Sequence, residues 1–504
     1  MAKITDLSAE LLAKIFTENG LPSRDLASAA VAASGFTFEA TRAAFIYNIN
    51  HERSSVLVWA ARHGQIKQIR RALTMGASPN TLGPGHGESK EKLDEYYHYE
   101  SEDEYDGPDA YGAPLHYAAL QGFDEMVLLL LQHGARMDVP SFDVCPCVEN
   151  CHLGLDELVP TPRWYPLHHA VCNGHVSTAN ILLDYGAPLE MSYLDQTWFS
   201  SRTLLHCAAA RGLDTLVQRA LELGADVSEL SPYGDSVLHF TSESWKSASV
   251  IKILLGAGAR LEANESEHGR TPIFQACHLA NYSTAMHLLK AGAKTNLARS
   301  SRSTPSLLHL AVDIGYSTQW DIRPQAHGDR DKEQVNFIRA LIDGSGFDVN
   351  EFMIQHLQHG VRRVTPLCCA LDLDEPRVRT IEQLNLDVAI LLLQKGADPN
   401  RTSRDRSRDN PVPLEYALRH FLSEAHAEPK SRLIPKLRRL INLMLDCGAQ
   451  FSTVEEDLRF DVEAEAELWN EGHETSCMLK RLLNQHRKQA SPKVSPKKNS
   501  PKKK

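Results

Sequence analysis

A unit of 33 to 35 residues recurs along the middle of this chain, and this repetition limits the possible folds more than any other feature. In residues 109–138 (DAYGAPLHYAALQGFDEMVLLLLQHGARMD), a polar turn precedes two short apolar segments that each end at a glycine. The same order returns at the anchor residues Leu205, Leu238, Ile273 and Leu308, which lie 33, 35 and 35 residues apart. One pair of short helices cannot bury its apolar face alone, so the units must stack on their neighbours.

Proline and glycine mark the expected helix boundaries within each unit. Pro114, Pro272 and Pro366 precede the anchor residue, in a first helical turn where a missing N–H group costs little. Glycine ends a helix because it adopts the left-handed conformation without a steric penalty. We expect helix-ending glycines after the first helix at Gly64, Gly122, Gly174 and Gly212, and after the second at Gly76, Gly134, Gly186, Gly224 and Gly396. Paired leucines such as Leu130–Leu131 predict the packed faces.

Turn, helix, glycine, second helix and Gly-Ala follow one another in fixed order, so residues 53–451 resemble ankyrin repeats. The resemblance implies an all-α solenoid of about nine repeats that binds proteins through inner helices and inter-repeat loops. It also implies that a recurrent histidine hydrogen-bonds the backbone and tightens each turn. The anchors are Leu57, Leu115, Leu167, Leu205, Leu238, Ile273, Leu308, Leu367 and Leu414, and the histidines are His116, His168, His206, His239 and His309. Val58 and Phe274 replace the histidine in two copies.

Long insertions interrupt the array. The main ones are residues 81–110, 139–165, 316–334 and 372–384, with further inter-repeat segments at 191–202, 351–364 and 401–411. Inter-repeat loops project along one edge of such a stack, so we expect these fingers to form part of a partner surface. Residues 88–109 are acidic and contain Tyr96, Tyr97, Tyr99 and Tyr105; disorder is one interpretation, and binding of a basic partner or modification of a tyrosine is the other.

Residues 1–50 do not follow the repeat. They predict an amphipathic helix, the turn LPSRDL and another helix. The order of apolar residues resembles an F-box, which implies docking on a Skp-type adaptor of a cullin ubiquitin ligase. The docking residues would be Leu7, Leu11, Leu12, Ile15, Phe16 and Leu26. Ser8 stands where proline is usual, and an N-terminal pair of capping helices is the alternative.

Cysteine usage suggests reduced thiols in an intracellular compartment, because ten cysteines in 504 residues are too few for a disulfide scaffold. We expect Cys172, Cys207, Cys277 and Cys369 to be small core residues. One finger brings four soft ligands into eight residues, namely Cys145, Cys147, Cys151 and His152. Zinc binding is one interpretation of this cluster, and reduced loop thiols are the other, since the spacing differs from that of common zinc sites.

The C-terminal region combines expected capping helices at 452–485 with a basic tail at 486–504, which we expect to be disordered. Ser491, Ser495 and Ser500 each precede proline and are candidate phosphorylation sites. The lysines favour a solvated tail or a nuclear-import signal over direct nucleic-acid binding.

The chain shows no nucleophile–base pair or phosphate-cradling loop, so we expect no enzymatic activity and no cofactor. Its longest apolar run near the first motif, 126–131, is too short to cross a membrane. The sequence therefore favours a nuclear or cytoplasmic protein-binding array. Its specific role would be a substrate receptor of a cullin-type ubiquitin ligase or, alternatively, a scaffold or regulator without a ligase link.

Overall fold

The computed structural model describes residues 55–83, 112–141, 144, 164–189, 203–231, 234–263, 270–295, 306–312, 327–357, 360–371, 385–401, 412–427, 431–451, 456–468 and 474–490. The chain divides into two compact units, Met1–Pro272 and Ile273–Lys504. The F-box-like residues, the Cys145–His152 cluster and the three Ser-Pro sites lie outside the described residues. No helix of the described part is long and apolar enough to span a membrane.

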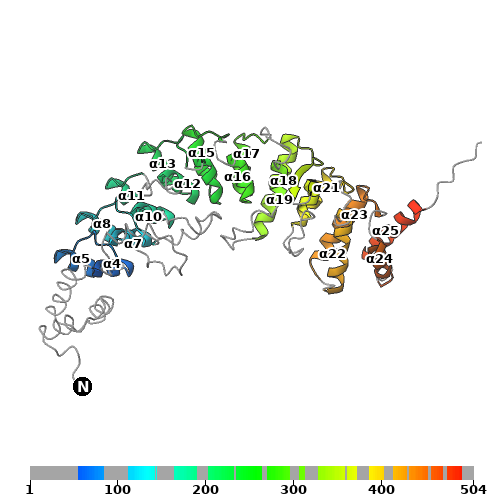
Figure 1. Cartoon of the computed structure of the whole chain (residues 1–504), viewed down its shortest axis with the longest axis horizontal. Coiled ribbons are helices and arrows are strands. Elements are labelled where there is room, and N and C mark those ends of the chain that lie inside the picture. The colour runs from blue at the N-terminus through cyan, green and yellow to red at the C-terminus, as the bar shows by residue number, and fades with distance from the viewer. Residues whose placement is uncertain are drawn as a thin grey trace, which may run out of the picture. The chain divides into compact units, whose positions relative to one another are not determined.

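The first unit is a stack of helix pairs. In chain order these are α4 (Ser55–Arg62) with α5 (Ile66–Thr74), α7 (Pro114–Gln121) with α8 (Asp124–Gln132), α10 (Pro166–Cys172) with α11 (Val176–Asp184), α12 (Leu204–Arg211) with α13 (Asp214–Glu222), and α14 (Val237–Phe240) with α15 (Ala248–Gly256). A 3-10 turn, η3 (Thr241–Glu243), follows α14. First helices contact first helices and second helices contact second helices, which gives the two rows seen in Figure 1.

The anchor residues form the core of this stack. Leu57, Leu115, Leu167, Leu205 and Leu238 are each at most 1% exposed. Burial of such a side chain contributes about 1.5–3 kcal/mol, so the recurrent leucine stabilises each repeat together with the buried residues of its second helix, such as Leu130 and Leu182. The prediction that stacking, rather than any single pair, supplies the core is confirmed.

The glycines that end the helices have the expected left-handed backbone. Gly122, which follows α7, has φ +71°, and an added Cβ would lie 2.5 Å from Nδ1 of His175 in the next repeat. A side chain there would therefore both strain the backbone and separate two repeats. In the second unit Ala280 occupies the corresponding position with φ 51°, the one positive φ of a non-glycine residue in the described part of the chain.

The second unit continues the pattern, and its helices α19 and α22 to α25 are longer than those of the first unit. Its pairs are α16 (Pro272–His278) with α17 (Tyr282–Lys290), α18 (Leu307–Val312) with α19 (His327–Ser345), α20 (Pro366–Ala370) with α21 (Leu386–Gln394), α22 (Pro413–Ala427) with α23 (Leu433–Asp446), and α24 (Glu456–Leu468) with α25 (Glu474–Ala490). The segment 351–364, expected as an inter-repeat insertion, contains the antiparallel hairpin of β1 (Met353–Leu357) and β2 (Gly360–Val364), with Met353 opposite Val364. α24 contacts α22, and α25 contacts α23, so this last pair stacks as the earlier ones do.

Two expected boundaries differ from the structure. The insertion predicted at 316–334 is too long, because α19 already begins at His327. Its buried Gln334 donates to the Ala311 carbonyl at 2.9 Å and to the Tyr282 hydroxyl at 3.1 Å, and these bonds fix the added turns against α18 and α17. The tail predicted from residue 486 begins later, because α25 extends to Ala490. Residues 486–490 contain no proline or glycine, and Pro492 disfavours helical backbone at the residue before it.

Candidate protein-binding surface

The last turn of each first helix presents side chains that the second helices do not cover. Immediately before the helix-ending glycine, the exposed residues of the first unit are His63, Gln121, Asn173 and Arg211. One position earlier lie Arg62, Leu120, Cys172 and Ala210, which are half-buried except for the buried Ala210. In these four repeats the identity of the exposed residue changes while the glycine that follows is the same. Sequence reasoning did not select this row, although variation beside a constant glycine was the available signal.

At one end of this row, α4 and α7 bring a cation and aromatic rings together. The Arg62 guanidinium lies 4.4 Å from the centre of the Tyr117 ring and donates to the Tyr117 hydroxyl at 2.5 Å. The rings of Trp59 and His63 stack with centroids 4.7 Å apart. Tyrosine, tryptophan and arginine are the residues most enriched at the centres of protein interfaces. Tyr117 itself is buried, so Trp59, Arg62 and His63 are the groups of this cluster that a protein partner could contact.

Two long fingers start and end at adjacent backbone points beside the first helices. Gly83 and Gly112 exchange two backbone hydrogen bonds of 3.1 and 2.9 Å, and Ser141 and Trp164 exchange two of 2.9 and 3.3 Å. An added Cβ at Gly83 would lie 2.6 Å from Cγ1 of Val58, so only glycine fits this approach to α4. The insertions predicted at 81–110 and 139–165 are therefore closed at their bases, and the residues between the bases lie outside the described residues.

The recurrent histidine fixes three of the first helices, α7, α14 and α18, to the chain that follows them. His116 Nδ1 accepts from the Ala113 N–H at 3.0 Å, and Nε2 donates to the Val139 carbonyl at 2.8 Å. His239 Nε2 donates in the same way to the Arg270 carbonyl at 2.8 Å, and His309 Nε2 donates to the Val364 carbonyl at 3.2 Å. In His116 one ring nitrogen accepts while the other donates, so this imidazole is neutral with its proton on Nε2. The expected backbone hydrogen bonding is confirmed at His116, His239 and His309.

A second buried imidazole lies beside His116 at the base of the second finger. His169 Nε2 is 2.7 Å from the Ser141 hydroxyl, and the His116 and His169 rings meet edge to face at 5.5 Å. Burial, with a smaller contribution from the charge of His169, lowers the pKa of His116 to about 3. Burial, with a smaller contribution from His168, lowers the pKa of His169 to about 3 as well. Both rings are neutral at physiological pH and serve as packing and hydrogen-bonding groups.

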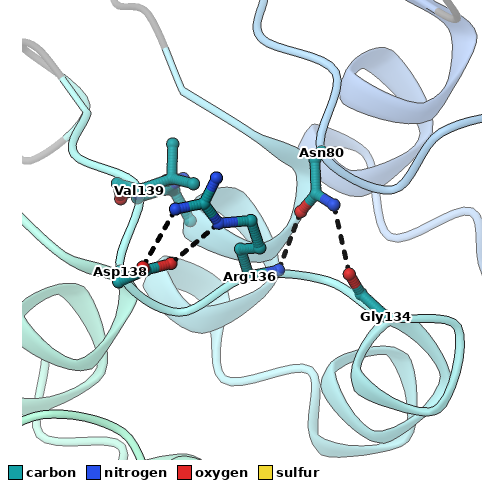
Figure 2. A network of polar contacts seen from close by, with 6 residues as sticks. Asn80, Gly134, Arg136, Asp138 and Val139 are labelled. Carbon is teal, nitrogen blue, oxygen red and sulfur yellow. Dashed lines mark hydrogen bonds and ion pairs between the residues drawn. The ribbon is translucent and has the colours of Figure 1, made fainter.

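Asparagine joins consecutive repeats at another point, on the turn after the second helix. Asn80 accepts from the Arg136 N–H at 2.7 Å and donates to the Gly134 carbonyl at 3.1 Å, as Figure 2 shows. Asn350 bonds Gly396 and Asp398 in the same way, and Asn400 bonds Gly448 and Gln450. These bonds lie near the surface and hold the turns at a constant spacing. Sequence reasoning missed them because each joins residues of two different repeats.

Asp138 occupies the corresponding position in the second repeat but pairs within its own turn. Its carboxylate accepts from Nε and Nη2 of Arg136 at 3.0 and 2.9 Å (Figure 2). The hydrogen bond from Arg136 lowers the pKa of Asp138, so this carboxylate is ionised at neutral pH.

Among the expected core thiols, Cys207, Cys277 and Cys369 are buried and Cys172 is half-buried. Burial raises the pKa of the Cys277 thiol, which makes it an unreactive packing group. In the part of the chain that the structure describes, no three His, Cys, Asp or Glu side chains are arranged to hold a metal ion.

Comparison with known proteins identifies the repeats. A family model for ankyrin repeats matches residues 102–193 and 204–299, so these stretches are ankyrin repeats and the helical solenoid predicted for them is confirmed. A transient receptor potential cation channel subfamily A member 1 homolog of Caenorhabditis elegans is 30% identical over 30% of this chain and 12% of its own length. Protein PhlB of Serratia liquefaciens is 34% identical over 23% of this chain and 50% of its own length.

The crystal structure of the human ASB11 ankyrin repeat domain is similar over 56% of this chain and 96% of that one, with 18% identity and a TM-score of 0.36. This chain spans no more than half the length of the first curated relatives it matches. Their names differ widely, which is expected because repeat arrays keep a constant frame and vary the exposed residues.

Proposed function

We propose that this ankyrin-repeat chain is a substrate receptor, which holds a protein target on the exposed row of its first helices and presents it to a cullin-type ubiquitin ligase. The observation that supports target binding is the row itself. Four exposed side chains of different chemistry (His63, Gln121, Asn173, Arg211) lie at one structural position of successive repeats. The fingers that close at Gly83–Gly112 and Ser141–Trp164 would extend the same surface.

The ligase link is supported by the apolar pattern of residues 1–50. The pattern resembles an F-box and precedes the first helix pair by only a few residues, so a docked adaptor would lie next to the array. In such a receptor the chain itself carries no catalytic group, and other subunits would transfer ubiquitin. This division of labour agrees with an exposed row whose chemistry suits binding.

Adaptor docking can be tested by co-purification. The full chain is expected to recover a Skp-type adaptor, and Leu11→Asp combined with Phe16→Asp should abolish recovery by placing charges on the docking face. The matched control is Tyr185→Asp with Leu223→Asp, because these residues are already 45% and 41% exposed on the array. Absence of adaptor, under conditions that recover a known F-box protein, would contradict the ligase role and favour a scaffold without it.

Target binding needs its own experiment. Proximity labelling from the full chain should identify neighbours that disappear with Gln121→Glu plus Arg211→Glu, since both changes add negative charge to the exposed row. Gln132→Glu plus Lys252→Glu makes the same changes of charge on exposed positions of the second helices and should leave those neighbours in place. Loss of the same neighbours with both pairs would show that the row is not the binding surface.

A further inference from the structure

The last first-row helix, α24, carries an exposed aromatic side chain. Phe460 is 72% exposed, the highest value among the exposed large apolar residues of the described chain. On the same helix Leu458, Val462 and Ala466 are buried, where α24 packs against α22 and α25. At 100° per residue, Phe460 and Ala464 lie on the opposite face, and both are exposed.

Carboxylates border this apolar centre on both sides. By the same helical geometry Asp457 and Asp461 lie along one edge and Glu463 and Glu467 along the other, and all four are exposed. The face therefore combines an aromatic ring with four negative charges. An extended segment that contains many lysines and a few apolar residues has the complementary chemistry.

Residues 491–504 of this chain have that composition. The sequence SPKVSPKKNSPKKK contains six lysines, three prolines and a valine, and no carboxylate side chain. The segment begins directly after α25, and α25 returns alongside α24 after a connection of five residues, 469–473. In an antiparallel pair the end of the second helix lies near the start of the first.

The length of the segment is sufficient. A 13-residue helix such as α24 is about 20 Å long. Fourteen extended residues span up to about 46 Å, more than twice that length.

We propose that residues 491–504 lie across the exposed face of α24. The lysines pair with Asp457, Asp461, Glu463 and Glu467, and the prolines and Val494 contact Phe460. Phosphorylation of Ser491, Ser495 or Ser500 would place phosphate beside the carboxylates and release the segment. The contact would thus control when the basic segment is available to other molecules. This inference does not depend on the ligase link.

The contact can be tested on the full chain by lysine acetylation. Mass spectrometry gives the acetylation rate of each lysine, and an ammonium held against a carboxylate reacts more slowly than a free one. We expect Lys493, Lys497 and Lys498 to react about twofold to threefold more slowly in the native chain than in a variant with four neutralised carboxylates. That variant carries Asp457→Asn, Asp461→Asn, Glu463→Gln and Glu467→Gln. In 1 M NaCl the difference should vanish.

A matched control removes four exposed carboxylates from the first unit, at Glu125→Gln, Glu222→Gln, Glu229→Gln and Glu243→Gln, and should retain the slow rates. Replacement of the three serines by glutamate should restore fast acetylation. Equal rates in the native chain and the α24 variant would overturn the proposal. Slow rates that disappear on dilution would assign the contact to a second copy and overturn binding by the chain's own segment.

Discussion

Two boundaries between neighbouring repeats, here called joints, are held together by different side chains. One follows the second repeat, whose anchor is Leu115, and the other follows the eighth, whose anchor is Leu367. In the second repeat His116 reaches the Val139 carbonyl, and Asp138 occupies the position that Asn80, Asn350 and Asn400 have in their repeats. In the eighth repeat Asn400 bonds Gly448 and Gln450, and Cys368 stands where other repeats have histidine. Each joint therefore has one of the two links, the histidine bond or the asparagine bonds, and lacks the other.

A proline explains the loss in the second repeat. The asparagine link needs an N–H two residues after the glycine of the next repeat, as Asn80 uses Arg136 after Gly134. Pro188 occupies that place after Gly186 and has no N–H, so an asparagine at 138 would lack one partner. In the eighth repeat Cys368 Sγ lies 3.9 Å from the Arg401 carbonyl, a weak contact in place of the histidine bond. Each of these two joints therefore has one strong link, and the two kinds of link differ in burial and in response to pH.

The largest expected difference between the two joints is their loss of stability at low pH. His116 and His169 have a pKa of about 3 when folded and near 6.5 when unfolded, so below pH 6.5 the unfolded chain binds protons that the folded chain does not. Their stabilisation is complete above pH 6.5 and falls by about 1.4 kcal/mol per pH unit for each ring toward pH 3. The second joint should therefore lose roughly 5 kcal/mol between pH 6.5 and 4.5, whereas the amide of Asn400 does not titrate.

Hydrogen exchange measured by mass spectrometry, corrected for the intrinsic exchange rate at each pH, can follow both joints in one sample. Peptides from 112–189 should lose protection at pH 4.5 before peptides from 385–450. His169→Phe should roughly halve the acid effect because one of the two rings no longer titrates. Equal loss of protection in the two regions would show that the buried imidazoles do not control acid stability.

Removing a buried link should lower the free energy of unfolding more than removing a link near the surface. His116→Ala leaves the Ala113 N–H and the Val139 carbonyl without their partner in the interior, so the free energy of unfolding should fall by about 3 kcal/mol. Urea unfolding of the full chain measures this change. The exposed His63→Ala is the control and should change it by less than about 0.5 kcal/mol.

The asparagine link should have a smaller effect. Asn400→Ala removes two hydrogen bonds whose backbone partners can turn to water, so we expect a loss of about 1 kcal/mol. Asn400→Asp keeps an acceptor for the Gln450 N–H but cannot donate to the Gly448 carbonyl. Its free energy of unfolding should therefore lie between those of the native chain and Asn400→Ala. A loss for Asn400→Ala as large as that for His116→Ala would remove the distinction between buried and surface links.

The sequence predicted the parts of the fold that repeat within one unit. The leucine anchors, the left-handed glycines and the bonded histidines all follow from spacing inside a single repeat. The asparagine links could not be found in this way, because each depends on an N–H in the next repeat, as Pro188 illustrates. The early start of α19 also depended on distant partners, since Gln334 is held by Ala311 and Tyr282.

The binding surface was only partly predictable. The fingers were expected as part of it, but the exposed row beside the glycines was not, because each member is an ordinary polar residue when considered singly. Phe460 was likewise hidden in an acidic helix whose exposed face follows from the packing of α22 and α25. The adaptor-docking residues Leu7, Leu11, Leu12, Ile15, Phe16 and Leu26 stay a prediction.

The closed base of the first finger has a consequence for how this array can change. Because Gly83 and Gly112 are bonded to each other, the rest of the stack meets the same two backbone points whatever sequence connects them. Natural insertions and deletions in that stretch can thus alter what the protein recognises while its folding is preserved. The same site would accept a peptide grafted by protein engineers.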